Sequence, residues 1–146
     1  MGRLVATAAA SLALAGCGGT GDPERWAGPP HEQPDGTIDV TGFEEHAADS
    51  DEPWTASPLL AAAEFLRLDW STAQTTALVA TTGAEGRGPT IVTATLDRVL
   101  DDSVRAKRYE LDFVRAGDKV RLRAARWTQQ CWPGRGHQDF STELCR

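Results

Sequence analysis

The sequence is notable first for what it has little of. No run of about 20 apolar residues occurs, so the chain offers no membrane-spanning helix. Basic residues are not in excess, with 15 Lys and Arg against 21 Asp and Glu and a net charge of −6. A nucleic-acid-binding domain carries a basic surface, and this composition excludes one.

Metal-site and catalytic patterns are also missing. The three cysteines and three histidines show neither C-x-x-C nor H-x-x-x-H spacing, which structural zinc sites use. His137, Asp139 and Glu143 are the polar side chains nearest the last two cysteines, and we expect no metal there. Ser141, His137 and Asp139 supply the residue types of a catalytic triad, but a triad is defined by geometry and residues this close on one loop seldom share a centre. We therefore expect no catalytic residue, no cofactor and no enzymatic activity.

The N-terminus carries a short apolar segment that ends in a cysteine. Arg3 precedes an uncharged run from Leu4 to Leu14, and eleven residues fit the apolar region of a signal peptide. The run closes with Leu14-Ala15-Gly16-Cys17, which resembles the lipobox of bacterial lipoproteins. The resemblance implies cleavage before Cys17, a diacylglycerol thioether on its sulfur and often a further acyl chain, such as palmitate, on the new amino group. More than one chain is needed for stable attachment, because a single acyl chain binds a membrane only weakly.

The cysteine count agrees with this interpretation. If Cys17 carries lipid, Cys131 and Cys145 remain, and two cysteines in an exported domain are most simply a disulfide. In the chain-entropy model, a disulfide that closes this segment stabilises the folded state by about 3 kcal/mol.

Composition divides the chain into three parts. Residues 1–16 are the predicted signal peptide. Residues 17–36 are rich in glycine and proline and are predicted to form a flexible acidic tether, with Trp26 alone in it as a candidate docking residue. Residues 37–146 are predicted to form one globular domain. Residues 18–57 hold ten acidic side chains and one basic one, so the acidity belongs to the front of the chain.

The sequence of the domain predicts a helix followed by strands. Ser57 is a good N-cap with Pro58 behind it, and apolar residues at helical spacing predict an amphipathic helix over 58–68 with Glu64 and Arg67 facing outward. Four strands follow, at 75–82, 90–96, 108–113 and 120–124, the last pair joined by a tight turn at Gly117 and with a bulge at Ala124-Ala125. Before the helix, Ile38 to Val40 reads as a short extended piece and Glu44 to Ala48 as a helical turn.

This order predicts an α+β fold in which one helix crosses a curved, four-stranded antiparallel sheet. The pattern of elements resembles cystatin-like or nuclear-transport-factor-like rolls. A small β-barrel is the alternative, and either fold serves many functions.

The last segment, Cys131 to Cys145, is unusual. Together with Asp101 to Arg105 and Arg108-Tyr109, it resembles the C-terminal loop of small, mostly uncharacterised lipoproteins of high-GC Gram-positive bacteria. Its candidate binding residues are Arg135, His137, Gln138 and Asp139. As a binding loop it would offer Arg135 to an anion. Alternatively, His137 and Asp139 hold the loop to the sheet, while Phe140 and Leu144 fill the core.

Other residues support two interpretations each. Asp97, Asp101 and Asp102 are either a paired-carboxylate site or, more simply, a turn held by Asp side chains. Trp127 and Trp132 are either sugar-stacking residues or, respectively, a core residue and a cover over the disulfide.

The function expected from these features is that of a lipid-anchored protein at the outer face of the cell membrane. Its domain is expected to be a non-enzymatic binding module for an envelope protein or a cell-wall component. The alternative is a small-ligand carrier or minor enzyme that uses the concave face of the sheet, and a third possibility is a structural spacer. The carrier requires an open cavity rather than a space filled by side chains such as Leu59, Phe65 and Phe113.

Overall fold

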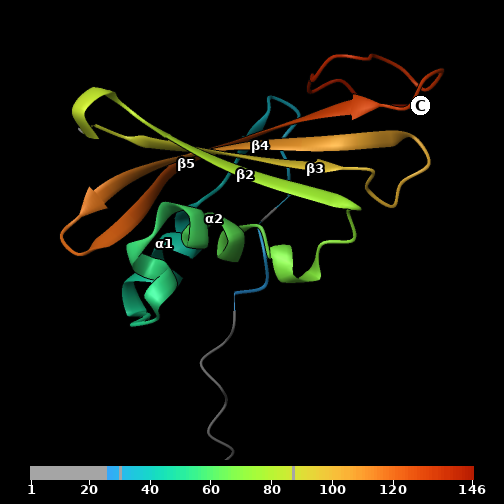
Figure 1. Cartoon of the computed structure of the whole chain (residues 1–146). Helices are drawn as coiled ribbons and strands as arrows, with labels where there is room; N and C mark the ends of the chain where they lie inside the picture. Colours follow the sequence, from blue (N-terminus) through green and yellow to red (C-terminus); the bar gives the residue numbers. More distant parts are fainter. Residues whose placement is uncertain (1–25, 30, 87) are drawn as a thin grey trace, which may run out of the picture.

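A five-stranded antiparallel sheet forms the body of the molecule, and helices cover one of its faces (Figure 1). The computed structural model describes residues 26–29, 31–86 and 88–146. The strands are β1 Thr37–Ile38, β2 Thr75–Thr82, β3 Thr90–Asp97, β4 Val104–Ala116 and β5 Lys119–Cys131. The helices are α1 Thr41–Asp49 and α2 Pro58–Phe65, with short 3-10 turns at Pro53–Ala56, Leu68–Trp70 and Ala84–Gly86.

The strand order is β1-β5-β4-β3-β2, so β2 to β5 form the antiparallel meander that the sequence predicts. The short β1 pairs with the outer edge of β5, Thr37 lying opposite Arg126. The α+β class is confirmed. The finer prediction of four strands and one helix is wrong, because the N-terminal segment adds both a strand and a helix. The sheet is open rather than closed into a barrel, and its architecture is not the expected cystatin-like roll.

The alternation of apolar and polar residues explains why the central strands form a sheet with one buried face. Tyr109, Leu111 and Phe113 are buried on the helix-covered face, while polar residues between them point to the other face. The pairing shifts where Asp112 faces Ala124 and Phe113 faces Leu122, which leaves Arg123 as the extra residue. The bulge is thus one residue earlier than predicted, and it returns Trp127 to the core.

Helix α2 begins where predicted but ends early and is rotated. The Ser57 hydroxyl accepts a hydrogen bond from Leu60 N, as expected of an N-cap. The helix ends at Phe65, and its buried residues are Ala61, Ala62 and Phe65, whereas Leu59 is 39% exposed. Arg67 adopts a left-handed conformation (φ 50°) and is only 6% exposed, so its predicted outward position is wrong.

The residues before α2 complete the core. Ile38 and Phe43 are buried and Val40 packs against them, as predicted for this extended piece. Helix α1 packs near β5, while α2 packs on β2 and β3. Among the residues described, no helix is long and apolar enough to cross a membrane.

Candidate functional site

The C-terminal segment is closed by a disulfide. Cys131 and Cys145 are bonded at 2.08 Å between their sulfur atoms, with their Cα atoms 5.5 Å apart, which confirms the predicted pairing. We refer to residues 131–145 as the disulfide loop. Gly136 passes close to the bond: a Cβ at this position would lie 2.8 Å from Cys131 Sγ, so only glycine fits.

Two of the four candidate binding residues hold the loop together. The Gln138 side-chain amide donates to the carbonyl oxygens of Cys131, Trp132 and Gly136 at 3.2–3.3 Å. His137 Nδ1 lies 2.8 Å from Asp139 O, and Nε2 lies 2.9 Å from Glu143 O. His137 therefore fixes the loop to itself rather than to the sheet.

The surroundings of His137 favour its charged form. A carbonyl oxygen can only accept a hydrogen bond, so both ring nitrogens donate only when the imidazole carries two protons. These two backbone hydrogen bonds raise the pKa of His137 above its usual 6.5, with the Glu143 carbonyl contributing most.

The other two candidate residues face solvent. Arg135 is half exposed, and its Nη2 lies 4.0 Å from Asp102 Oδ2. Asp139 is exposed, and its backbone carbonyl rather than its carboxylate is the partner of His137. Only Arg135 and Asp139 thus have side chains free to meet a ligand.

Three side chains of the types that bind metal ions come together in this loop. The ligand atoms of Cys131, His137 and Cys145 lie within 4.8 Å of one another, whereas Asp139 and Glu143 do not belong to this group. Both sulfur atoms are bonded to each other, and both imidazole nitrogens face carbonyl oxygens. In the oxidised loop these atoms are therefore already engaged.

The triad residue types do not form a hydrogen-bonded series. Ser141 bonds to Gln129 through its backbone, and its hydroxyl accepts from Glu143 N at 3.1 Å. His137 contacts neither the Ser141 hydroxyl nor the Asp139 carboxylate among the hydrogen bonds of the described residues.

The acidic turn between β3 and β4 is a structural turn, as its simpler interpretation predicts. Asp101 Oδ1 accepts from Ser103 N at 2.8 Å, Ser103 Oγ at 2.8 Å and Val104 N at 2.7 Å. These bonds stabilise the carboxylate and lower its pKa. Asp97 faces Arg105 instead, at 3.3 Å. The three carboxylates thus have separate partners.

Trp132 joins the disulfide loop to this turn. Its backbone N–H donates to Ser103 O at 2.9 Å and its indole Nε1 donates to Asp101 O at 3.2 Å. Trp127 is a core residue, 4% exposed, as predicted. Leu144 is 81% exposed, so the expectation that it fills the core is wrong, and Phe140 stacks over Arg108 at 3.7 Å.

The turn and the loop together present one surface. A hollow of about 440 Å³ lies between Arg98, Leu100 and Trp132, and a second of about 330 Å³ lies between Lys107, Trp127 and Leu144. Both are lined by Asp101. We name this region the loop-end surface and define it by Leu100, Asp101, Asp102, Trp132, Arg135 and Leu144.

Sequence reasoning missed a part-buried polar group that lines the second hollow. Glu32 Oε1 accepts a hydrogen bond from the Tyr109 hydroxyl at 2.7 Å, and Glu32 Oε2 lies 2.7 Å from Lys107 Nζ. Burial and the neighbouring carboxylate raise the pKa of Tyr109 strongly. Trp127 Nε1 donates to Gln33 O at 2.8 Å. Local sequence could not reveal this group, because its members lie some 75 residues apart.

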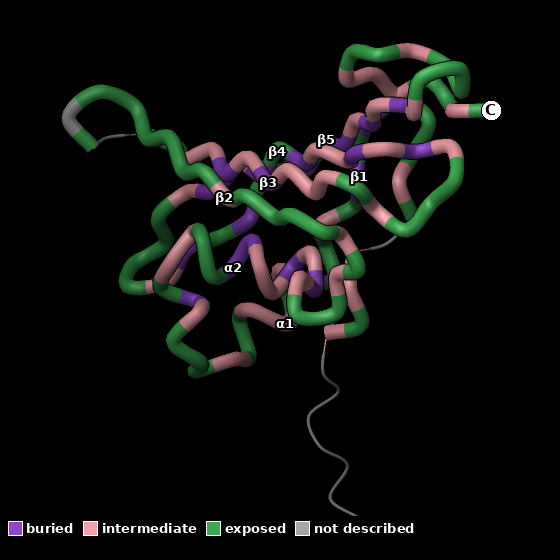
Figure 2. Tube along the Cα trace, turned by 45° about the vertical axis from the view of Figure 1, so that its right-hand side comes forward, coloured by how far each residue is buried: buried purple, intermediate pink, exposed green. Residues whose placement is uncertain are grey.

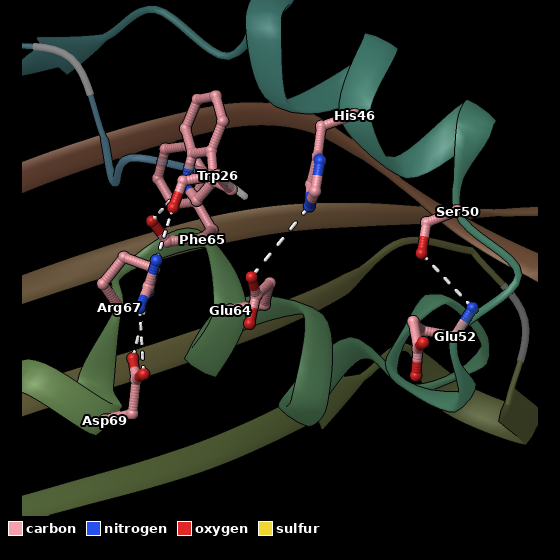
Figure 3. Close-up of polar contacts among 8 residues, drawn as sticks. All are labelled: Trp26, His46, Ser50, Glu52, Glu64, Phe65, Arg67 and Asp69. Atoms are coloured by element: carbon pink, nitrogen blue, oxygen red, sulfur yellow. Dashed lines mark hydrogen bonds and ion pairs between the residues drawn. The ribbon is translucent and has the colours of Figure 1, made fainter. Parts of the chain in front are cut away.

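A second missed cluster holds Trp26 on the helical layer (Figure 3). The Trp26 indole donates to Phe65 O at 2.9 Å, and Arg67 donates to Trp26 O while its guanidinium also bonds Asp69. The Asp69 carboxylate raises the pKa of Arg67. Trp26, which the sequence leaves as either a docking residue or a residue without a role, thus packs on the domain itself.

His46 completes this cluster. Its ring stacks between those of Trp26 and Trp54, with centroids 6.1 and 5.5 Å away. Its Nε2 lies 4.0 Å from Glu64 Oε1 (Figure 3).

The concave face of the sheet is largely filled. Phe65, Leu111 and Phe113 are buried between α2 and the sheet. A hollow of about 370 Å³ remains at one end, where Leu59 and Val120 line its wall.

Comparison of this chain with protein-family models, with curated protein sequences and with solved structures gives no match. The lipobox-like residues Leu14 to Cys17 and the predicted signal peptide lie outside the described residues.

Proposed function

We propose that this chain is a lipid-anchored, non-enzymatic interaction module of the cell envelope, and that the loop-end surface is where it binds its partner. The observation that carries the proposal is the exposure of two leucines on an otherwise fixed surface. Leu144 and Leu100 are 81% and 79% exposed, more than any other large apolar residue described. Both flank hollows, and Trp132 lies between the turn and the loop. Contiguous apolar patches with a polar rim mark interaction sites, and we propose that the two leucines and Trp132 form such a patch.

The surface is rigid enough to act as a preformed site. The disulfide, His137 and Gln138 hold the loop, and Asp101 holds the turn, so little conformational entropy is lost when a partner binds. Arg135 and Asp102 supply charges of both signs beside the leucines. This mixture suits a protein surface better than a uniformly polar glycan, so we favour an envelope protein as partner over a cell-wall component.

The anchor is proposed from the resemblance of Leu14-Ala15-Gly16-Cys17 to a lipobox, with lipid on Cys17. Trp26 packs in the helical layer, while the disulfide loop lies beyond the end of β5, above the sheet in the view of Figure 1. Trp26 follows Cys17 by nine positions in the sequence, a distance of at most about 30 Å when the chain is fully extended. A docked Trp26 would therefore hold the helices toward the membrane and turn the loop-end surface away from it.

Photo-crosslinking tests the proposed surface. A photoreactive residue is placed at position 100 or 144 of the full chain in its own membranes, with position 116, at the opposite end of β4, as the control. We expect both test positions to give the same envelope-protein adduct, and Arg135→Glu to reduce its yield.

The control position should give no such adduct. Adducts with wall glycan alone would identify a cell-wall component, rather than an envelope protein, as the partner. Equal labelling from all three positions, or none from 100 and 144, would remove the loop-end surface as the binding site.

A further inference from the structure

Within the described part of the chain, no segment pairs with the outer edge of β2. This strand has eight residues, no charge, no proline and no glycine, and its pairing with β3 runs from end to end without a bulge. Seven of its residues are exposed, and Figure 2 shows the strand green along almost its whole length. Proteins usually protect such edges with lysine, proline, a bulge or a covering segment, because an unpaired edge is a template for another strand.

The opposite edge of the same sheet is covered. Strand β1 pairs with β5 at Thr37 and Ile38, and Ser141 from the disulfide loop pairs with Gln129 further along. Gly36 makes the approach possible, because a Cβ there would lie 2.8 Å from the Thr142 side chain. Among residues 26–29, 31–86 and 88–146, two separate segments therefore cover one edge of the sheet and none pairs with the β2 edge.

The sequence of β2 matches its own reverse. It reads Thr-Thr-Ala-Leu-Val-Ala-Thr-Thr, and only the central Leu78 and Val79 differ under reversal, both of them aliphatic. Directly opposed residues in an antiparallel pair lie on the same face, so a two-fold axis between the strands sets one residue opposite its own copy, here Leu78 or Val79. In either register, only threonine and small or aliphatic side chains face one another within the strand. No like charges oppose this pairing.

Apolar side chains flank the edge. Val79 is 59% exposed on the face away from the helices, and on the other face α2 packs beneath β2 and β3. From α2, Leu59 and Leu60 are 39% and 52% exposed, and Leu59 shares a hollow with Ala80 and Thr82. A two-fold axis beside β2 would bring two copies of this apolar margin together. Burial of their apolar surface would then stabilise the dimer in addition to the backbone hydrogen bonds.

We propose that two copies of this chain associate through antiparallel pairing of their β2 strands, which joins their sheets into one ten-stranded sheet. The occupant of the edge is a second copy because the strand is complementary to itself. The proposal does not depend on the loop-end surface or on the lipid anchor.

The double variant Ala77→Lys/Val79→Lys tests this pairing in the full chain purified in a mild detergent. With the axis at Leu78 each new lysine faces another across the strands, and with the axis at Val79 the two copies of residue 79 face each other. The matched control is Ala116→Lys/Ala124→Lys, which adds the same charge at exposed positions of β4 and β5. Sedimentation equilibrium should give twice the chain mass for the parent and the control. The edge variant should associate roughly tenfold more weakly, because opposed like charges destabilise a strand pair.

Hydrogen exchange of the β2 amides provides a second measurement that needs no variant. Amides that point outward from a free edge exchange rapidly, whereas those in a β2–β2 pair are protected, and protection should rise with protein concentration. Circular dichroism checks that the edge variant stays folded.

A parent chain that stays monomeric with freely exchanging β2 amides would overturn the proposal. So would a dimer that the two edge lysines leave intact, since it would use another surface. Protection of β2 that appears only when membrane extract is added would assign the edge to a foreign strand and equally overturn it.

Discussion

At the scale of the residue, His137 is the clearest case of a side chain whose role follows from its two neighbours. Both ring nitrogens face backbone carbonyl oxygens of the disulfide loop. The sequence places His137 in a loop but does not say whether it faces a ligand or the loop itself. That choice depends on where the disulfide brings residue 143, which no local pattern contains.

We expect the stability of the chain to fall as pH rises through the pKa of His137. This pKa is raised in the folded state, so the folded chain binds the proton on His137 more tightly than the unfolded chain does. The contribution is then fully present below pH 6.5 and is lost as pH increases through the raised value. Denaturant unfolding of the parent and of His137→Gln at a series of pH values between 5 and 9 measures it.

The difference between these two proteins isolates the contribution of His137 to the pH dependence of stability. The parent should lose more of its unfolding free energy across this range than the variant does. Equal pH dependence in both proteins would show that the imidazolium does not hold the loop.

At the scale of the element, the strands are the most predictable part of the fold. Runs of β-branched residues on either side of a turn predict β2 and β3 to within a residue. The alternation over Tyr109 to Phe113 indicates a sheet buried on one face, but the predicted strand 108–113 is only the middle of β4. The end of α2 was not predictable in the same way. Arg67 continues the helical pattern in sequence, but its bonds to Asp69 and to the Trp26 carbonyl favour a left-handed turn there.

The docked segment around Trp26 is an element that composition alone assigns to a tether. Glycine and proline predict flexibility over residues 17–36, yet Trp26, Glu32 and Gln33 all contact the domain. These contacts depend on partners many residues away. A single tryptophan in a polar segment was the one local signal that could have indicated them.

We expect Trp26→Ala to destabilise the full chain by about 2–3 kcal/mol, below the range for a fully buried tryptophan because this side chain is half buried. The variant loses stacking with Phe65 and His46 as well as one hydrogen bond. Leu100→Ala, at a position 79% exposed, is the control and should change stability by less than about 0.5 kcal/mol.

Chemical denaturation measures both variants, and limited proteolysis should cut the Trp26→Ala chain sooner between residues 26 and 36. If its unfolding midpoint equals that of the parent, Trp26 does not hold this segment on the domain.

At the scale of the whole molecule, the proposed orientation at the membrane depends on where the Trp26 segment and the disulfide loop lie. The segment at Trp26 lies with the helices, and the disulfide loop lies beyond the end of β5, apart from them (Figure 1). Lipid at Cys17 would make the helical side face the membrane and the loop-end surface face outward. A second copy joined through β2 would place two such surfaces on one continuous sheet.

Intact-mass analysis of the protein extracted from the membrane fraction tests this account most directly. We predict a chain that begins at Cys17, carries diacylglycerol on that residue, and lacks two hydrogen atoms because Cys131 and Cys145 are joined. A chain that retains residues 1–16 without lipid and carries three free thiols would contradict the anchor, the compartment and the preformed loop together.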